Sequence, residues 1–176
     1  MKATKSLARL NALDAAEAER ELLKCCGSTG WAQSLAAQRP FGETQELLTA
    51  ADDIWRNLSE CDWLEAFAAH PKIGGRKAAR EQGAQARNWS EQEQSGARAA
   101  EGATLDELAE GNRIYEEKFG HIFIVCATGK TAHEMLVLLR ARLPHDASVE
   151  LRHAAEEQRK ITRLRLEKLL SQESGV

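Results

Sequence analysis

The sequence predicts an all-α fold, a single-domain helical bundle with one buried extended segment near residues 121–127. Apolar residues recur at three- and four-residue spacing along most of the chain, and long alternating stretches are missing. The exception is "GHIFIVCATG" (120–129), a run of β-branched and aromatic residues between glycines. Because 176 residues suit one compact domain, we expect a single domain over residues 1–176.

Seven helices are expected, each from local signals. Asp14 is a plausible N-cap for the first, and the turn-tolerant run Gly27–Gly30 ends it. Pro40 stops the second, and apolar stripes at helical spacing indicate the others. The charged segment 75–88 is weakly amphipathic and is left open as a loop or a mobile helix. The expected helices span residues 15–26, 31–41, 42–60, 62–70, 104–119, 130–143 and 148–170.

Composition and charge exclude several classes of protein. A net charge of −3 gives no overall attraction to nucleic acid, so no nucleic-acid partner is expected. No apolar run approaches the ~18 residues of a membrane span, and the N-terminus lacks the apolar core of a signal peptide. The four cysteines fit neither a CxxC redox motif nor a zinc pattern. Reduced, mostly buried thiols in a cytoplasmic protein with no membrane contact are the simplest interpretation.

The run Ile122-Phe123-Ile124-Val125 reads, taken alone, as a buried strand. A lone strand among helices has no sheet, so its buried N–H and C=O groups need other partners. A small polar ligand could be one of them. The start of the next helix, or a strand-like filler of the core, is an equal alternative.

The stretch "AAHPKIGG" (68–75) places a histidine at a constrained helix exit. Pro71 disfavours helical dihedrals at His70, so the helix should end there with the imidazole projecting, a geometry that suits a cleft. The glycine pair 74–75 permits close approach of a ligand, and the nearby basic residues favour an anionic substrate. The alternative is a histidine that only caps the helix and interacts with its dipole.

A second candidate is "SEQEQSGA" (90–97), in which Ser90 and Glu93 have the spacing of a capping box. The functional alternative is that the Glu93 carboxylate and the His70 imidazole form an acid/base pair. The remaining histidines lack the spacing of metal ligands, and no glycine-rich phosphate loop is present. We therefore expect no catalytic metal.

Four motifs, in this order, resemble the family of 2-oxo-4-hydroxy-4-carboxy-5-ureidoimidazoline (OHCU) decarboxylases of urate breakdown. They are "HPKIGGRKAA", "SEQEQSGA", "GNRIYEEKFGHIFIVCATGKTAHEMLVLLRARL" and "EEQRKITRLRLEKLL", and the opening "NALDAAEAERELLKCCGSTGWAQSLAAQRPF" is similar as well. The resemblance covers nearly the whole chain. It implies an all-α homodimer that uses no cofactor and converts OHCU to (S)-allantoin and carbon dioxide.

The resemblance also assigns site residues. It implies His70 as the catalytic imidazole with Glu93 beside it, and a backbone at Ile122–Val125 that meets the ureido and ring amides of the substrate. An arginine of "RLRL" belongs to the site and is carried onto Arg163, with Arg165 as the alternative. The other residues that it places in the pocket are Pro71, Ser90, Gln94, Ile122, Phe123, Ile124 and Val125.

The chain departs from the family where Pro144-His145 follows "RL", since an asparagine is common at the second of these positions. Two competing interpretations stand beside the decarboxylase. A non-catalytic helical interaction module would explain the amphipathic helices but not His70-Pro71 together with Glu93-Gln94. A metal-dependent hydrolase of the same pathway is disfavoured by the histidine spacing. The homodimer is also expected because the last helix carries apolar residues on two sides, around Ile161 and around Leu169.

Overall fold

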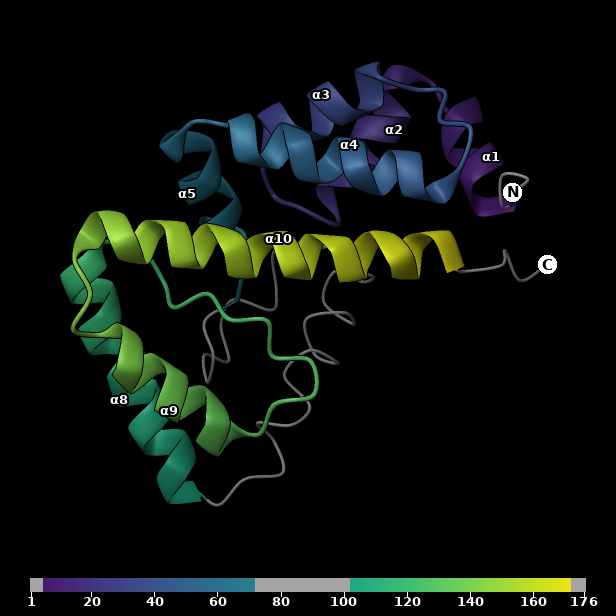
Figure 1. The fold of residues 1–176 in the computed structure, drawn as a ribbon. Coiled ribbons are helices and arrows are strands. Elements are labelled where there is room, and N and C mark those ends of the chain that lie inside the picture. The colour runs from purple at the N-terminus through teal and green to yellow at the C-terminus, as the bar shows by residue number, and fades with distance from the viewer. Residues whose placement is uncertain (1–4, 72–101, 172–176) are drawn as a thin grey trace. The chain divides into compact units, whose positions relative to one another are not determined.

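The computed structural model describes residues 5–71 and 102–171, in which every regular element is a helix (Figure 1). The predicted all-α class is therefore confirmed. None of the helices in these ranges is long and apolar enough to cross a membrane. The helices are α1 (Lys5–Ala12), α2 (Ala15–Leu23), α3 (Thr29–Ala37), α4 (Thr44–Asn57), α5 (Glu60–Ala68), α8 (Gly102–Phe119), α9 (Ala132–Arg142) and α10 (Ala147–Ser171).

Helix α1 and the start of α3 differ in an instructive way from the prediction, and the other helix ends differ by a few residues. Helix α1 was not expected; it is only eight residues long and buries Leu7 and Leu10, so its stability comes from packing that local signals do not show. Helix α3 begins at Thr29, inside the predicted turn, because the hydroxyl of Ser28 accepts a hydrogen bond from the Trp31 N–H at 3.2 Å and caps it. The segment 75–88 lies outside the described residues.

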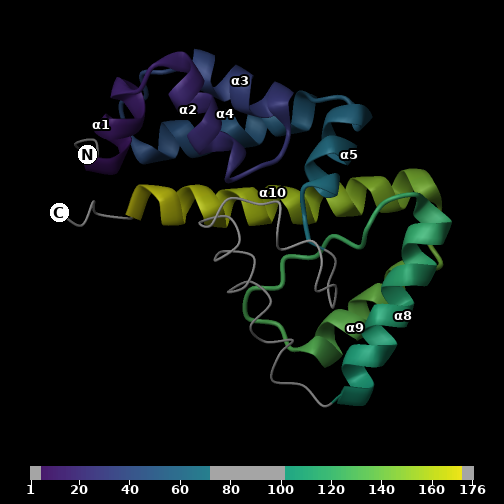
Figure 2. The same cartoon turned by 180° about the vertical axis from the view of Figure 1, so that it is seen from behind.

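The chain divides into two compact units, which are described separately. The terminal unit comprises residues 1–66 and 159–176, and the central unit comprises residues 67–158. In the terminal unit α2 packs on α3 and α3 packs on α4, as Figures 1 and 2 both show. The indole of Trp31 is fully buried there and donates to the Ala51 carbonyl at 3.1 Å. The expectation of a single domain stays a prediction.

In the central unit α8 and α9 lie side by side (Figure 2). Gly111 permits their close approach, because a Cβ at this position would lie 2.8 Å from Cδ2 of Leu139. The segment 121–127 shares this core, to which it contributes Phe123, Val125 and Ala127. The core therefore joins the two helices to the stretch of backbone that the sequence singled out.

The central unit contains a fully buried carboxylate, that of Glu150. Glu150 of α10 is fully buried and accepts hydrogen bonds from Arg142 Nε at 2.7 Å and from the Tyr115 hydroxyl. Its second oxygen lies 2.8 Å from Nδ1 of His145. Burial raises the pKa of Glu150, but the hydrogen bonds from Arg142 and Tyr115 oppose this and leave the pKa below its ordinary value. The carboxylate is therefore ionised and paired.

The apolar residues that suggested a dimer are covered within the single chain. Ile161, Leu166, Leu169 and Leu170 of α10 are all buried, and Leu164 is half-buried. The premise that α10 presents surplus apolar surface was therefore wrong. The dimer itself stays a prediction, which no longer has this argument behind it.

We predict that Arg142→Met lowers the free energy of unfolding by about 3–5 kcal/mol, because it leaves the Glu150 carboxylate buried without its main partner. The double variant Arg142→Met/Glu150→Leu should lose less than the single one, since the buried charge is then gone. Urea denaturation measures both. The control is Arg113→Met on α8, whose guanidinium pairs with Glu110 and Glu117 but is exposed, so that its loss should leave the free energy of unfolding nearly unchanged. Equal losses for Arg142→Met and Arg113→Met would contradict the role given to the buried pair.

Candidate functional site

His70 leaves α5 as its sequence predicts. The helix ends at Ala68, and the His70 N–H donates to the Phe67 carbonyl at 3.1 Å. The half-buried imidazole does not fold back onto the helix end: its Nε2 lies 2.6 Å from Oε1 of Gln158 on α10, a residue with no exposed surface. Pro71 follows, also half-buried. The imidazole is thus held by a side chain 88 positions away in the sequence.

Residues 122–127 form neither a helix nor a strand. The glycines on either side of this segment adopt left-handed dihedrals, with φ of 75° at Gly120 and 76° at Gly129. The next helix, α9, begins only at Ala132, so the alternative of an early helix start is excluded. Phe123, Ile124 and Val125 are buried and Ile122 is half-buried. The predicted buried non-helical segment is therefore present, without strand pairing in the described residues.

Side chains bind the backbone groups of this segment, as the missing sheet requires. Arg142 Nη1 donates to the Ile124 carbonyl at 2.8 Å. The Cys126 N–H donates to Oε2 of Glu157 at 2.7 Å, and Lys130 Nζ donates to the Cys126 carbonyl at 2.7 Å. The prediction that these groups need other partners is confirmed at three atoms. Contact of Ile122–Val125 with a ligand stays a prediction.

Arg163 and Arg165, the two candidates for the arginine of the site, have different surroundings within the terminal unit. The Arg163 side chain is 34% exposed and lies 3.4 Å from Oδ2 of Asp52, which also pairs with Arg159 at 2.8 Å. Arg165 is buried, and its charge acts on the thiols of Cys25 and Cys26. Which of the two arginines contacts a ligand stays a prediction.

The cysteines agree with the expectation of reduced and mostly buried thiols. All four are free; Cys25, Cys26 and Cys126 are buried and Cys61 is exposed. Burial raises the pKa of Cys26 to about 11 and that of Cys25 further, which keeps both thiols protonated and unreactive. Over the described ranges, no three His, Cys, Asp or Glu side chains lie where they could share a metal ion.

Three predicted site residues, Ser90, Glu93 and Gln94, lie outside the described residues, as do the glycine pair 74–75 and the basic residues near it. The approach of Glu93 to His70 is therefore untested. His145, at the position where the chain departs from the family pattern, binds Glu150 and stacks on His153 with ring centroids 5.0 Å apart. Its contacts are thus with the buried carboxylate.

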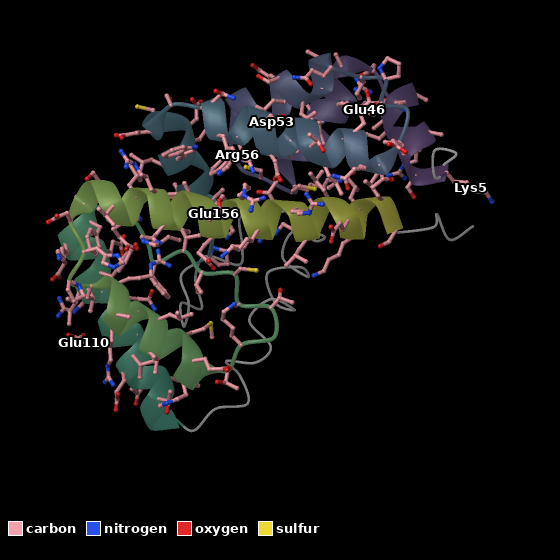
Figure 3. The ribbon with its side chains drawn as sticks, viewed as in Figure 1. Lys5, Glu46, Asp53, Arg56, Glu110 and Glu156 are labelled. Atoms are coloured by element: carbon pink, nitrogen blue, oxygen red, sulfur yellow. The ribbon has the colours of Figure 1, made fainter. Side chains whose placement is uncertain are left out.

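The sequence interpretation missed Glu157 and Gln158. A signal for Gln158 was present, because it falls four residues after Ala154 and three before Ile161, on the buried stripe of α10. A polar residue in such a stripe needs a buried partner. Glu157 is adjacent and half-buried, and nothing in the local pattern distinguishes it from its exposed neighbour Glu156 (Figure 3).

Comparisons with known proteins agree on one family. The model of the family described as OHCU decarboxylase matches residues 11–167. The uric acid degradation bifunctional protein TTL of Arabidopsis thaliana is 46% identical over 160 residues, which are 90% of this chain and 49% of that protein. The 2-oxo-4-hydroxy-4-carboxy-5-ureidoimidazoline decarboxylase of Amia calva is 29% identical over 133 residues, 75% of each chain. This chain therefore spans about half the length of the Arabidopsis protein and three quarters of the Amia protein.

A solved structure agrees as well. The crystal structure of OHCU decarboxylase in the presence of (S)-allantoin has a TM-score of 0.74 and 43% sequence identity to this chain, and the match covers 86% of this chain and 98% of that one.

Proposed function

Because the chain belongs to the OHCU decarboxylase family, we propose that it converts OHCU to (S)-allantoin and carbon dioxide in the degradation of urate. The match of the family model to residues 11–167 carries this proposal. The solved decarboxylase that resembles the chain over 98% of its own length supports it, because it was crystallised in the presence of (S)-allantoin. The proposed substrate is a small molecule, and no nucleic acid or membrane takes part.

The reaction breaks the bond between the substrate ring and its carboxylate. Carbon dioxide leaves, the bonding electron pair stays on the substrate, where the conjugated carbonyl and imine hold it, and a proton takes the place of carbon dioxide. The protein has to orient the carboxylate, stabilise the developing anion and deliver the proton to one face. If the proton reaches only one face of the substrate anion, only one enantiomer of allantoin forms. Since the substrate supplies the electron sink, we propose that neither a metal nor a cofactor takes part.

We propose His70 and Glu93 as the catalytic residues. An imidazole, with an ordinary pKa of about 6.5, exchanges protons near neutral pH, and its anchored position beside Gln158 supports this role. Glu93 would orient the imidazole or hold the substrate hydroxyl. The proposed binding residues are Pro71, Ser90, Gln94, the backbone of Ile122–Val125, and Arg163.

We further propose that residues 1–176 act as one domain and that the chain works in the cytoplasm. The continuous family match supports the first statement, and four free cysteines, as expected in a reducing compartment, support the second.

The proposed activity is tested by chiral detection of allantoin formed from freshly generated OHCU, with and without the protein, in the presence of EDTA. We expect rapid formation of (S)-allantoin that EDTA does not affect. A racemic product at the spontaneous rate would refute the proposed activity. Loss of activity in EDTA with recovery on adding zinc or manganese would refute the cofactor-free mechanism.

We predict that His70→Asn retains the fold but lowers turnover by about 10²–10⁴-fold, because a positioned acid/base group typically contributes that much. Glu93→Gln should also be slow, and the two losses should be far from additive if the residues act as a unit. Enantioselective turnover and melting temperature are measured on the same preparations.

The matched control is His133→Asn, since His133 is exposed on α9 and should be neutral in both measurements. If His70 were only a helix cap and Glu93 half of a capping box, each change would cost roughly 1 kcal/mol of stability and leave turnover nearly intact. A stable His70→Asn protein with wild-type turnover would end the catalytic interpretation.

The family resemblance also leads us to propose a homodimer. Sedimentation equilibrium at micromolar concentration should give twice the chain mass of 19.5 kDa. A monomer under these conditions would count against the dimer and would leave the proposed activity untouched.

A further inference from the structure

Two consecutive residues of α10 each bind one part of the proposed site. Gln158 is fully buried, and its Oε1 lies 2.6 Å from Nε2 of His70. Glu157 is half-buried, and its Oε2 accepts the Cys126 N–H at 2.7 Å. All four residues belong to the central unit. One turn of one helix is therefore bonded both to the imidazole and to the non-helical segment.

We propose that Glu157 and Gln158 are positioning residues of the site: Gln158 fixes the tautomer and orientation of the His70 imidazole, and Glu157 fixes the backbone at Cys126. This inference rests on the proposed function, because it assigns a catalytic task to what these two side chains hold. Neither residue is required to touch the substrate.

The bond to Gln158 determines which nitrogen of His70 exchanges the proton. The amide oxygen of a glutamine only accepts hydrogen bonds, so Nε2 carries its hydrogen whether the ring is neutral or charged. The proton that is gained or lost is then the one on Nδ1. The arrangement presents one defined ring nitrogen to the reaction.

The partner of the His70 imidazole is a neutral amide and not a carboxylate, and this difference affects the charge of the imidazole. A carboxylate at this distance would favour the imidazolium and raise the pKa of His70. A neutral amide fixes the ring equally well without adding a charge. Gln158 therefore orients the imidazole without placing a charge beside it.

Glu157 acts on a backbone that no strand pairs with among residues 5–71 and 102–171. Its carboxylate forms a charge-assisted bond to the Cys126 N–H, while Lys130 binds the carbonyl of the same residue. Since both polar groups of the Cys126 backbone are held, the neighbouring peptide groups are fixed in direction before a substrate arrives. A fixed direction is what recognition of ureido and ring amides by this backbone requires.

The tautomer of His70 tests the role of Gln158 directly. In ¹⁵N-labelled protein without substrate, the nitrogen shifts of His70, assigned by comparison with His70→Asn, should show the Nε2–H form. Gln158→Met removes the acceptor at similar volume and should give a mixture of tautomers. Gln158→Glu keeps an acceptor oxygen and should keep the Nε2–H form while raising the pKa of His70. An Nδ1–H tautomer in the wild-type protein would overturn the proposal.

Steady-state kinetics distinguish a role of Gln158 in positioning His70 from a role in stabilising the fold alone. Gln158→Met should lower kcat by about 10- to 100-fold, as loss of an orienting partner does for histidines that bind metals, with little change in KM. Gln158→Glu should retain more activity and shift to higher pH the limb of the rate–pH profile that reports the ionisation of His70. The control is the exposed neighbour Glu156→Gln, which should match the wild type. Wild-type kcat and pH profile in a folded Gln158→Met protein would refute the role of Gln158.

The role of Glu157 is tested separately, by hydrogen exchange at the Cys126 amide and by KM. Glu157→Leu should accelerate hydrogen exchange at the Cys126 amide and raise KM more than it lowers kcat, because binding by the backbone is weakened. Unchanged exchange and KM would refute its role. The tautomer and the exchange rate are both measured without substrate, so failure of the proposed decarboxylase activity would be recognised separately from failure of these two assignments.

Discussion

The central unit depends on one buried charge. Glu150 has no exposed surface, and an isolated carboxylate in that position would cost several kcal/mol. Its partners come from different elements: Tyr115 from α8, Arg142 from α9 and His145 from the connection before α10. The carboxylate is therefore acceptable only when all of these elements are in place, which restricts how they can pack.

Arg142 links the buried carboxylate to the backbone of the proposed site. The same guanidinium that pairs with Glu150 also donates to the Ile124 carbonyl at 2.8 Å. An all-α protein uses most of its backbone polar groups within helices, where only those at the helix ends are available to a ligand. Here charged side chains hold a short non-helical segment at the backbone of Ile124 and Cys126, so that a stretch of main chain can stay out of helical hydrogen bonding within a helical core.

The sequence predicted features with local causes and missed those with long-range causes. Apolar spacing indicated seven helices, Pro71 marked the exit at His70, and the glycines bounded the segment 120–129, because each signal acts over a few residues. Helix α1 was missed, since only packing stabilises it. The partner of His70 was missed because Gln158 lies 88 positions away. The pairing of Glu93 with His70 was one of two alternatives drawn from the residues and was assigned by the family resemblance; it stays a prediction, because no local pattern could supply it.

The polar residues on the buried stripe of α10 show how a sequence could mark such partners. Apolar burial stabilises a helix, so each polar side chain there has to offset its desolvation with a specific bond. Glu150 does so with Arg142, and Gln158 does so with His70. In the part of the chain that the structure describes, no buried side-chain nitrogen or oxygen lacks a partner. If Gln158 served packing alone, an apolar residue of similar volume would avoid the desolvation cost. Its presence is better explained by what its oxygen holds, which is the imidazole at the helix exit.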